Sequence, residues 1–243
     1  MLGDVEQYQE ELKQWEQYFQ ETCDVCHGKG VRQLPDSTLP VRCICLRKAE
    51  FYATLLVSGF PRRFLLNEKS WDDFKLHDGA VTAAMDYTIR FDTYYNECKG
   101  VYIYGKRGQG KTLLQSLIMR GVMNQQNPHT RRPYSGCYLM AYDLIALSHV
   151  ARDEYRERLR LERVINKHDL LIIDNLGGET GSKDYNTRFF EHLIQQRDNL
   201  GAVTIIGSTV VPDQLAEHYG EYIQAYVDKR CIQISMLKHQ PTF

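Results

Sequence analysis

A glycine-rich stretch that ends in lysine and threonine carries the clearest chemical signal. It reads Gly105-Lys106-Arg107-Gly108-Gln109-Gly110-Lys111-Thr112 and fits G-x-x-x-x-G-K-[ST], the pattern of a phosphate-binding loop. Backbone N–H groups of such a loop converge on a polyphosphate, and the positive end of the following helix adds attraction. Lys111 would reach the outer phosphates, and the Thr112 hydroxyl would ligate Mg²⁺. The alternative is a plain glycine-rich turn.

A second signal, a carboxylate at the end of an apolar run, lies downstream of this loop. The apolar run Asp169-Leu170-Leu171-Ile172-Ile173-Asp174 closes on a carboxylate, which is the form of a Walker B strand. Asp174 would help to hold the Mg²⁺. The alternative is a buried strand with an incidental acidic end.

Four cysteines form two close pairs near the N-terminus, at Cys23, Cys26, Cys43 and Cys45. Two thiol pairs separated by a short loop suit a tetrahedral Zn²⁺ that a small segment needs in order to fold. Cys23-x-x-Cys26-His27 also matches a c-type haem attachment site, but the second cysteine pair would then be idle. Free thiols are the third possibility.

The elements that must position these residues follow from periodicity. A strand at 101–104, the loop and a helix at 111–124 occur in the order that the phosphate-binding pattern demands. Further strands are expected at 138–141, 169–174, 202–209 and 232–234, with helices at 46–58, 79–95, 143–166, 187–197 and within 214–226. Strands that alternate with helices imply an α/β fold with a parallel sheet and a nucleotide at the carboxyl ends of the strands.

An amphipathic helix is expected at 4–22, before the cysteines. Its apolar side chains step by three and four along a narrow, largely aromatic seam, namely Val5, Tyr8, Leu12, Trp15 and Phe19. This seam packs either on the neighbouring module or on a partner protein. We therefore expect two domains, 1–58 with the helix and the cysteine-rich module, and 59–243 with the nucleotide site.

Composition bounds the classes of protein that remain. The hydrophobic content is 43%, the charged content is 25%, and the net charge is −1, so any nucleic-acid site must be a local patch. No apolar run approaches a membrane span of roughly 18 residues. Seven cysteines without a secretory signal favour a reducing cytoplasm, with thiols or metal and no disulfides.

The motifs, in this order, resemble those of the AAA+ ATPases of the DnaC/DnaI helicase-loader group and their IstB-type transposition relatives. The segments Gly59-Phe60-Pro61-Arg62-Arg63-Phe64 and Ser70-Trp71-Asp72-Asp73-Phe74 look like the region before the ATPase core in those proteins. Asp169–Glu179 resembles their Walker B run, and Thr204–Thr209 resembles their sensor 1 strand. A cysteine-rich N-terminal module recurs in many of them.

The resemblance implies a P-loop AAA+ (ASCE) parallel sheet sandwiched by helices, without a C-terminal helical lid. It also implies an ATPase that binds a replicative hexameric helicase through its N-terminal region and single-stranded DNA through its ATPase domain. Such proteins self-associate as a spiral with ATP between neighbours. The alternatives are a transposition regulator that assembles on duplex DNA and a scaffold whose nucleotide is structural.

Three departures from the family pattern concern hydrolysis. Asn175 stands where a second acidic residue is usual, and Thr209 stands where sensor 1 usually ends in Asn. The arginine finger would fall at Tyr226 without a gap, and Arg230 lies four residues on. We therefore expect ATP binding with slow turnover, with Lys111, Asp174, Asn175, Thr209 and Arg230 as the catalytic set.

A stripe of arginines supplies a candidate contact with DNA. Arg152, Arg156, Arg160 and Arg163 fall within an arc of about 80° if one helix runs unbroken through them. The alternative is a solvated face on which Asp153 pairs with Arg156, and Glu157 pairs with Arg160.

Overall fold

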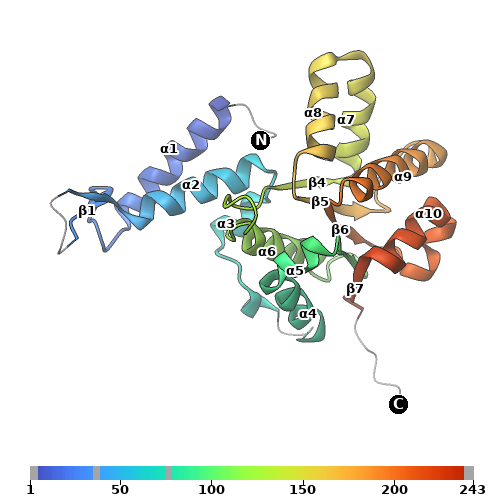
Figure 1. The fold of residues 1–243 in the computed structure, drawn as a ribbon, viewed down its shortest axis with the longest axis horizontal. Coiled ribbons are helices and arrows are strands. Elements are labelled where there is room, and N and C mark those ends of the chain that lie inside the picture. Colours follow the sequence, from blue (N-terminus) through green and yellow to red (C-terminus); the bar gives the residue numbers. More distant parts are fainter. Residues whose placement is uncertain (1–4, 35–38, 75–77, 238–243) are drawn as a thin grey trace. The chain divides into compact units, whose positions relative to one another are not determined.

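The computed structural model describes residues 5–34, 39–74 and 78–237. The chain divides into two compact units, Met1–Leu66 and Asn67–Phe243 (Figure 1). The second unit thus starts later than the predicted start at residue 59. The short helix α3 (Arg62–Leu66) belongs to the first unit, where Arg62 forms an ion pair with Glu11. Within the described ranges, no helix is long and apolar enough to cross a membrane.

The first unit consists of two main helices and a small hairpin. Helices α1 (Val5–Glu21) and α2 (Ile44–Val57) pack along each other, and strands β1 (Val31–Arg32) and β2 (Val41–Arg42) form an antiparallel pair between them in sequence. Trp15 and Phe19 of the predicted seam are buried, and both rings contact Tyr52 of α2. The second half of the seam therefore packs inside its own unit, whereas Val5 at its start is exposed.

The second unit begins with the single turn η1 (Trp71–Asp73) and helices α4 (Asp78–Ile89) and α5 (Phe91–Asn96). Its five strands are β3 (Gly100–Tyr104), β4 (Gly136–Met140), β5 (Leu170–Leu176), β6 (Val203–Ser208) and β7 (Cys231–Ser235). Between them lie α6 (Lys111–Met123), α7 (Ala141–Asp153), α8 (Tyr155–Asn166), α9 (Lys183–Asn199), the turn η2 (Pro212–Gln214) and α10 (Leu215–Arg230).

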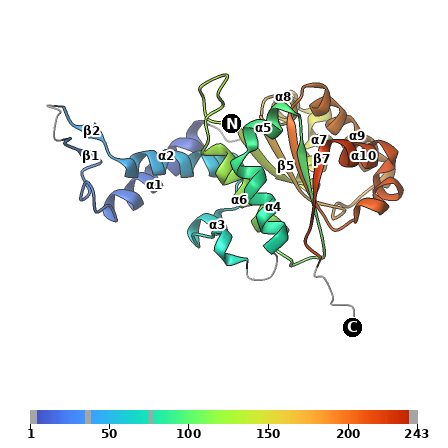
Figure 2. The ribbon, with the colours of Figure 1, turned by 60° about the horizontal axis from the view of Figure 1, so that its bottom comes forward.

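The sheet is parallel throughout, with strand order β4-β5-β6-β3-β7. The connection from β3 to β4 runs in the opposite direction to the later ones, so right-handed crossovers place α6 on one face and α7, α9 and α10 on the other. Figure 2 shows this arrangement, with α4 beside α6. The carboxyl ends of β3, β5 and β6 meet at one edge. The predicted parallel sheet sandwiched by helices is confirmed, and among the described residues no helix follows β7.

Two predicted helices are each broken in two. Residues 79–95 form α4 and α5, which meet at Arg90, and residues 143–166 form α7 and α8, which meet at Glu154. Glu154 has extended dihedrals, with φ −110° and ψ 115°. The Arg158 guanidinium donates to the carbonyls of Ala151 and Arg152 and so satisfies the end of α7. The premise of one unbroken arginine helix is therefore wrong, and Arg152 lies on a different helix from Arg156, Arg160 and Arg163.

A buried arginine ties α9 to the strands beside it. Arg197 is fully buried, and its guanidinium donates to the Thr204 hydroxyl and to the carbonyls of Ile165, His168 and Val203. The surrounding carbonyls compensate for the loss of water around this cation. The contacts hold the loop before β5 against the start of β6. They lie at the amino-terminal ends of the strands, whereas the phosphate-binding loop lies at the carboxyl-terminal ends.

Candidate functional site

The predicted phosphate-binding loop joins the end of β3 to the start of α6, as the pattern demands. Its glycines at 105, 108 and 110 all have positive φ, which side chains with a Cβ rarely adopt. A Cβ at Gly105 would lie 2.6 Å from Gln109 Oε1 and 2.9 Å from Met236 Cβ, and one at Gly110 would lie 2.9 Å from the Phe74 ring. Both glycines are therefore required for a loop that curls tightly around the helix start.

Lys111 is folded back onto this loop. Its ammonium donates to the carbonyls of Gly105, at 2.7 Å, and Lys106, at 3.0 Å, and the side chain is only 7% exposed. Burial lowers the pKa of Lys111, and the charge of Asp174 partly offsets that effect. A buried cation held only by loop carbonyls is a suitable partner for an entering phosphate, so the loop fits the polyphosphate of ATP.

The two predicted metal-binding side chains meet directly. Thr112 Oγ1, in the first turn of α6, donates to Oδ2 of Asp174 at 2.6 Å. Asp174 lies near the end of β5, is 2% exposed, and also accepts from the backbone N–H of Asn175 at 2.8 Å. A hydroxyl and a carboxylate at the edge of a phosphate loop are oxygen ligands of the kind Mg²⁺ prefers. These residues therefore fit a Mg²⁺–ATP complex.

Two further residues that sequence reasoning missed complete the surroundings of Asp174. The Tyr138 hydroxyl, from β4, donates to Oδ2 at 2.5 Å. Gln115, from α6, donates its amide to Oδ1 at 2.8 Å in the orientation in which its oxygen also accepts from Gly207 N at 2.9 Å. The available signal was a glutamine at a buried position of an apolar helix face.

The turn after β5 holds the predicted water-orienting position. Asn175 has φ +59°, and a Cβ at Gly178 would lie 2.0 Å from its Nδ2, so the amide folds over its own turn. Glu179 also binds this turn, because Oε2 accepts from Gly177 N at 2.9 Å and Oε1 accepts from the Tyr219 hydroxyl. Burial and this bond raise the pKa of Tyr219. Both side chains thus have structural partners in the turn.

The predicted sensor residue lies beside the same turn. Thr209 is exposed just past β6, and its Oγ1 is 3.5 Å from the point that a Cβ on Gly177 would occupy. Ser208, the last residue of β6, is buried and donates to the carbonyl of Leu176 at 2.7 Å. Of these two hydroxyls, that of Thr209 belongs to the exposed residue.

The two arginine-finger positions differ in exposure. Tyr226 is 6% exposed on α10, so its side chain belongs to the core. Arg230, at the end of α10, keeps 43% of its side chain exposed and forms an ion pair with Asp198 at 3.0 Å. It lies beside the start of β7, away from the phosphate-binding loop of its own chain, so any contact with ATP would have to be with a neighbouring chain.

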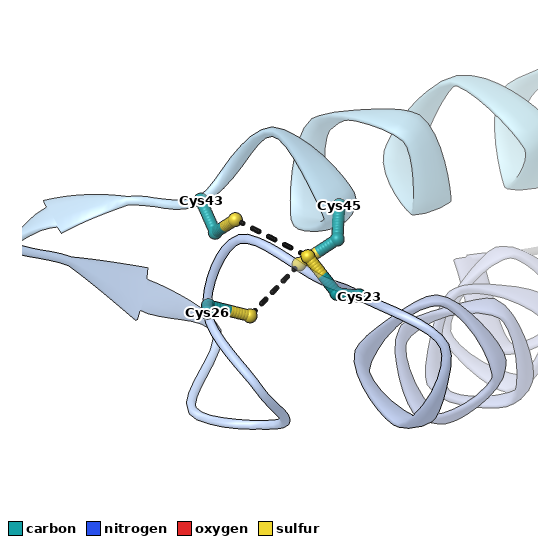
Figure 3. A group of neighbouring side chains, drawn as sticks. All are labelled: Cys23, Cys26, Cys43 and Cys45. Atoms are coloured by element: carbon teal, nitrogen blue, oxygen red, sulfur yellow. Dashed lines mark hydrogen bonds between the residues drawn. The ribbon is translucent and has the colours of Figure 1, made fainter.

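The four N-terminal cysteines converge on one point, as Figure 3 shows. All four sulfurs lie within 4.8 Å of one another, with Cys23 and Cys43 at 3.7 Å and Cys26 and Cys45 at 3.6 Å. These separations are close to the edge of about 3.8 Å that Zn–S bonds of roughly 2.3 Å give a tetrahedron. The cluster is compatible with zinc, whereas a haem attachment would use only the first pair. Figure 3 also shows that the ligands come from the knuckle after α1 and from the start of α2.

Positive φ at three closely spaced turn positions shapes that knuckle. His27 has φ +48°, Gly28 +86° and Gly30 +67°. Gly30 N donates to Cys26 Sγ at 3.3 Å, and a Cβ at Gly30 would lie 2.9 Å from Gln20 of α1. The glycines therefore allow the turn that brings Cys23 and Cys26 to the same point as the second pair.

The chain was compared with known proteins, and no family model matches it. Over 171 residues it is 23% identical to the replicative helicase loader DnaI of Bacillus subtilis (strain 168), a match that spans 68% of this chain and 51% of that protein. The chain thus matches about half the length of this curated relative.

Solved structures extend the comparison to the fold. A crystal structure of DnaI superposes with TM-score 0.55 at 24% identity, over 72% of this chain and 93% of that one. The DnaC helicase loader gives 0.54 at 19% identity, over 68% and 95%. The replication initiator DnaA bound to AMPPCP and single-stranded DNA gives 0.55 at 18% identity, over 69% and 49%. The chain is thus similar in sequence to the helicase loader DnaI and has the AAA+ fold of the DnaI and DnaC loaders.

Proposed function

We propose that this protein is an ATP-dependent replication accessory factor that loads or recruits a replicative hexameric helicase on single-stranded DNA in the cytoplasm. The observation that carries the proposal is the joining of Thr112 to Asp174 beside a glycine loop that holds Lys111, in a chain similar to the loader DnaI. The DnaA structure with AMPPCP and single-stranded DNA, which has the same fold, supports a nucleotide and DNA as ligands.

ATP with Mg²⁺ would supply the charged polyphosphate whose terminal bond is cleaved. Lys111 would leave the carbonyls of Gly105 and Lys106 to meet the outer phosphates, and the backbone N–H groups of residues 105–112 would hold the rest. Thr112 would turn its hydroxyl from Asp174 to the metal, and Asp174 would help to hold the metal. Each of these changes is a short movement of a side chain already at the site.

Hydrolysis would depend on weaker parts of the site. Asn175 is a neutral amide that cannot act as a base, and Thr209 would sense the phosphate. Arg230 would leave Asp198 to meet the ATP of a neighbouring chain, which supports self-association through the nucleotide interface. We infer a switch whose ATP-bound state matters more than its turnover.

The zinc module would bind the partner. Cys23, Cys26, Cys43 and Cys45 would hold Zn²⁺ and fix the β1–β2 hairpin, which carries exposed apolar side chains at Val31, Leu34 and Leu39. A folded module of this size with apolar residues in water suits a protein partner. The helicase is the partner that the similarity to DnaI supports.

The test mixes the purified chain with the hexameric helicase of its native host, with ATP or ADP. Light scattering after size exclusion should show a stoichiometric complex, and the complex should place helicase on circular single-stranded DNA. The Lys111→Ala protein serves as the control that lacks the nucleotide switch. ATP-dependent filaments on duplex DNA without helicase binding would instead identify a transposition regulator. If neither the helicase complex nor the filaments form, the scaffold hypothesis is the one that remains.

A further inference from the structure

The Walker B carboxylate is surrounded by donors on both of its oxygens. Oδ2 accepts from the hydroxyls of Thr112 and Tyr138, and Oδ1 accepts from Asn175 N and from the Gln115 amide. Asp174, Tyr138 and Gln115 are 2%, 4% and 0% exposed. Water therefore has little access to this carboxylate, and protein groups set its orientation.

Two of the four donors are explained by the loop motif or by the chain itself. Thr112 belongs to the loop motif and would turn to the metal, and Asn175 N is part of the chain next to Asp174. Tyr138 and Gln115 are different, because they come from β4 and from the second turn of α6. The strand register pairs Tyr138 with Ile172, two residues before Asp174, so both side chains emerge on the same face of the sheet.

The backbone around this network leaves space for it. A Cβ on Gly207 of β6 would lie 2.6 Å from the nearer terminal atom of the Gln115 amide and 2.7 Å from Asp174 Oδ1. No larger residue fits there without displacing one of the two side chains. Gly207 N instead donates to the Gln115 oxygen, which fixes the amide nitrogen toward Asp174.

We propose that Tyr138 is a positioning residue for Mg²⁺, holding Asp174 Oδ2 in place when Thr112 turns to the metal. Without the phenol, Oδ2 would lose the donor that fixes its orientation once Thr112 has turned away. Gln115 holds the other oxygen in the same way. This inference rests on the proposed Mg²⁺–ATP function of the site.

The test measures affinity for a fluorescent ATP analogue in excess Mg²⁺ and in EDTA. Tyr138→Phe keeps the ring and removes one oxygen. We expect the variant to bind about tenfold more weakly than wild type with Mg²⁺ and within about twofold of wild type in EDTA, because the lost hydrogen bond to a charged group orients a carboxylate that would contribute to nucleotide binding only through the metal. A purely structural role would weaken both conditions alike.

Tyr134→Phe is the matched control. Tyr134 is 1% exposed and donates to another carboxylate, Asp92, at 2.9 Å, away from the loop. The Tyr134→Phe variant should bind the nucleotide analogue with the same Mg²⁺ dependence as wild type. Gln115→Met supplies a second variant on the opposite oxygen, with a loss in the same direction, and keeps the test valid if Tyr138→Phe folds poorly.

The outcomes separate this inference from the proposed function. If wild type binds the analogue with Mg²⁺ and both variants keep its full Mg²⁺ dependence, Tyr138 does not position Asp174 and the proposed ATP site stands. If wild type itself binds no nucleotide, the proposed function fails first.

Discussion

The Thr112 hydroxyl donates to Asp174 Oδ2 across 2.6 Å, joining the first turn of α6 to β5 although 62 residues separate them. Strand β6 lies between β3 and β5, so this contact bridges from the phosphate-binding loop across an intervening strand. The fold itself therefore joins the two predicted metal-binding positions. Pre-assembly lowers the cost of ordering side chains when Mg²⁺–ATP binds.

Replacing Lys111 with alanine should abolish or severely weaken ATP binding. The charged hydrogen bonding of this lysine to phosphate would be lost, at about 1.5–3 kcal/mol per bond. A fluorescent ATP analogue reports the affinity. Lys106→Ala is the matched control, since Lys106 is exposed and contributes its backbone to the loop. Equal affinities for wild type and Lys111→Ala would show that the phosphate-binding loop is wrongly assigned.

Protein purified without chelator should carry about one zinc per chain, bound by the four cysteines. Replacing Cys43 and Cys45 together with serine should remove the zinc and unfold the first unit, while the second unit keeps its nucleotide affinity because its core is separate. Cys98→Ser, outside the group, should leave the zinc content unchanged. Metal analysis that finds no zinc in the wild type would reject the site.

Charge reversal at Arg156 and Arg160 should weaken binding to single-stranded DNA and flatten its salt dependence, because each lost phosphate contact lowers the salt slope by about one. Both residues are exposed on α8, and Arg160 pairs with Glu157 at 3.2 Å, so that pair competes with DNA. Reversal of exposed Arg90, where α4 meets α5, is a control away from α8 with half that change in charge, and it should leave DNA binding nearly unchanged. Wild-type binding by the α8 variant at low and high salt would exclude this face.

The sequence predicts those features of the fold and site that residues close together in the chain form, and it misses those that depend on contacts between distant residues. The loop from Gly105 to Thr112 and the zinc pairs are short patterns whose geometry their own residues impose. The break at Glu154 was missed because glutamate favours helix, and the turn is instead held by Arg158 reaching back to α7. Tyr138 was missed as a partner of Asp174 because the two residues meet only through the pairing of β4 with β5, and the sequence alone does not specify which strands are neighbours.

Acid should destabilise the protein partly through His168. This side chain is 8% exposed, and burial lowers its pKa from 6.5 to about 4. The folded state then binds fewer protons than the unfolded state between those values, so stability is complete above pH 6.5 and is lost as the pH falls toward 4. The loss amounts to about 3 kcal/mol. Urea unfolding at pH 7 and pH 4.5 should show a smaller difference for His168→Gln than for wild type.

The matched control for that measurement is His192→Gln, at an exposed position of α9. Its pH dependence should follow wild type. If the His168→Gln protein loses as much stability as wild type between the two pH values, protonation of His168 does not cause the loss.

The protein should bind ATP well and turn it over at well under about one per second. Hydrolysis needs a water in line with the outer phosphate, a group that orients it and a positive charge opposite. Asn175 cannot act as a base, and its amide lies over Gly178. Glu179 is a carboxylate nearby, but it binds Gly177 N and Tyr219. A steady-state assay with DNA and helicase present measures the rate. Asn175→Glu should raise it, and Glu179→Gln should leave it nearly unchanged. Turnover of several per second that is lost in Glu179→Gln would instead make Glu179 the catalytic carboxylate.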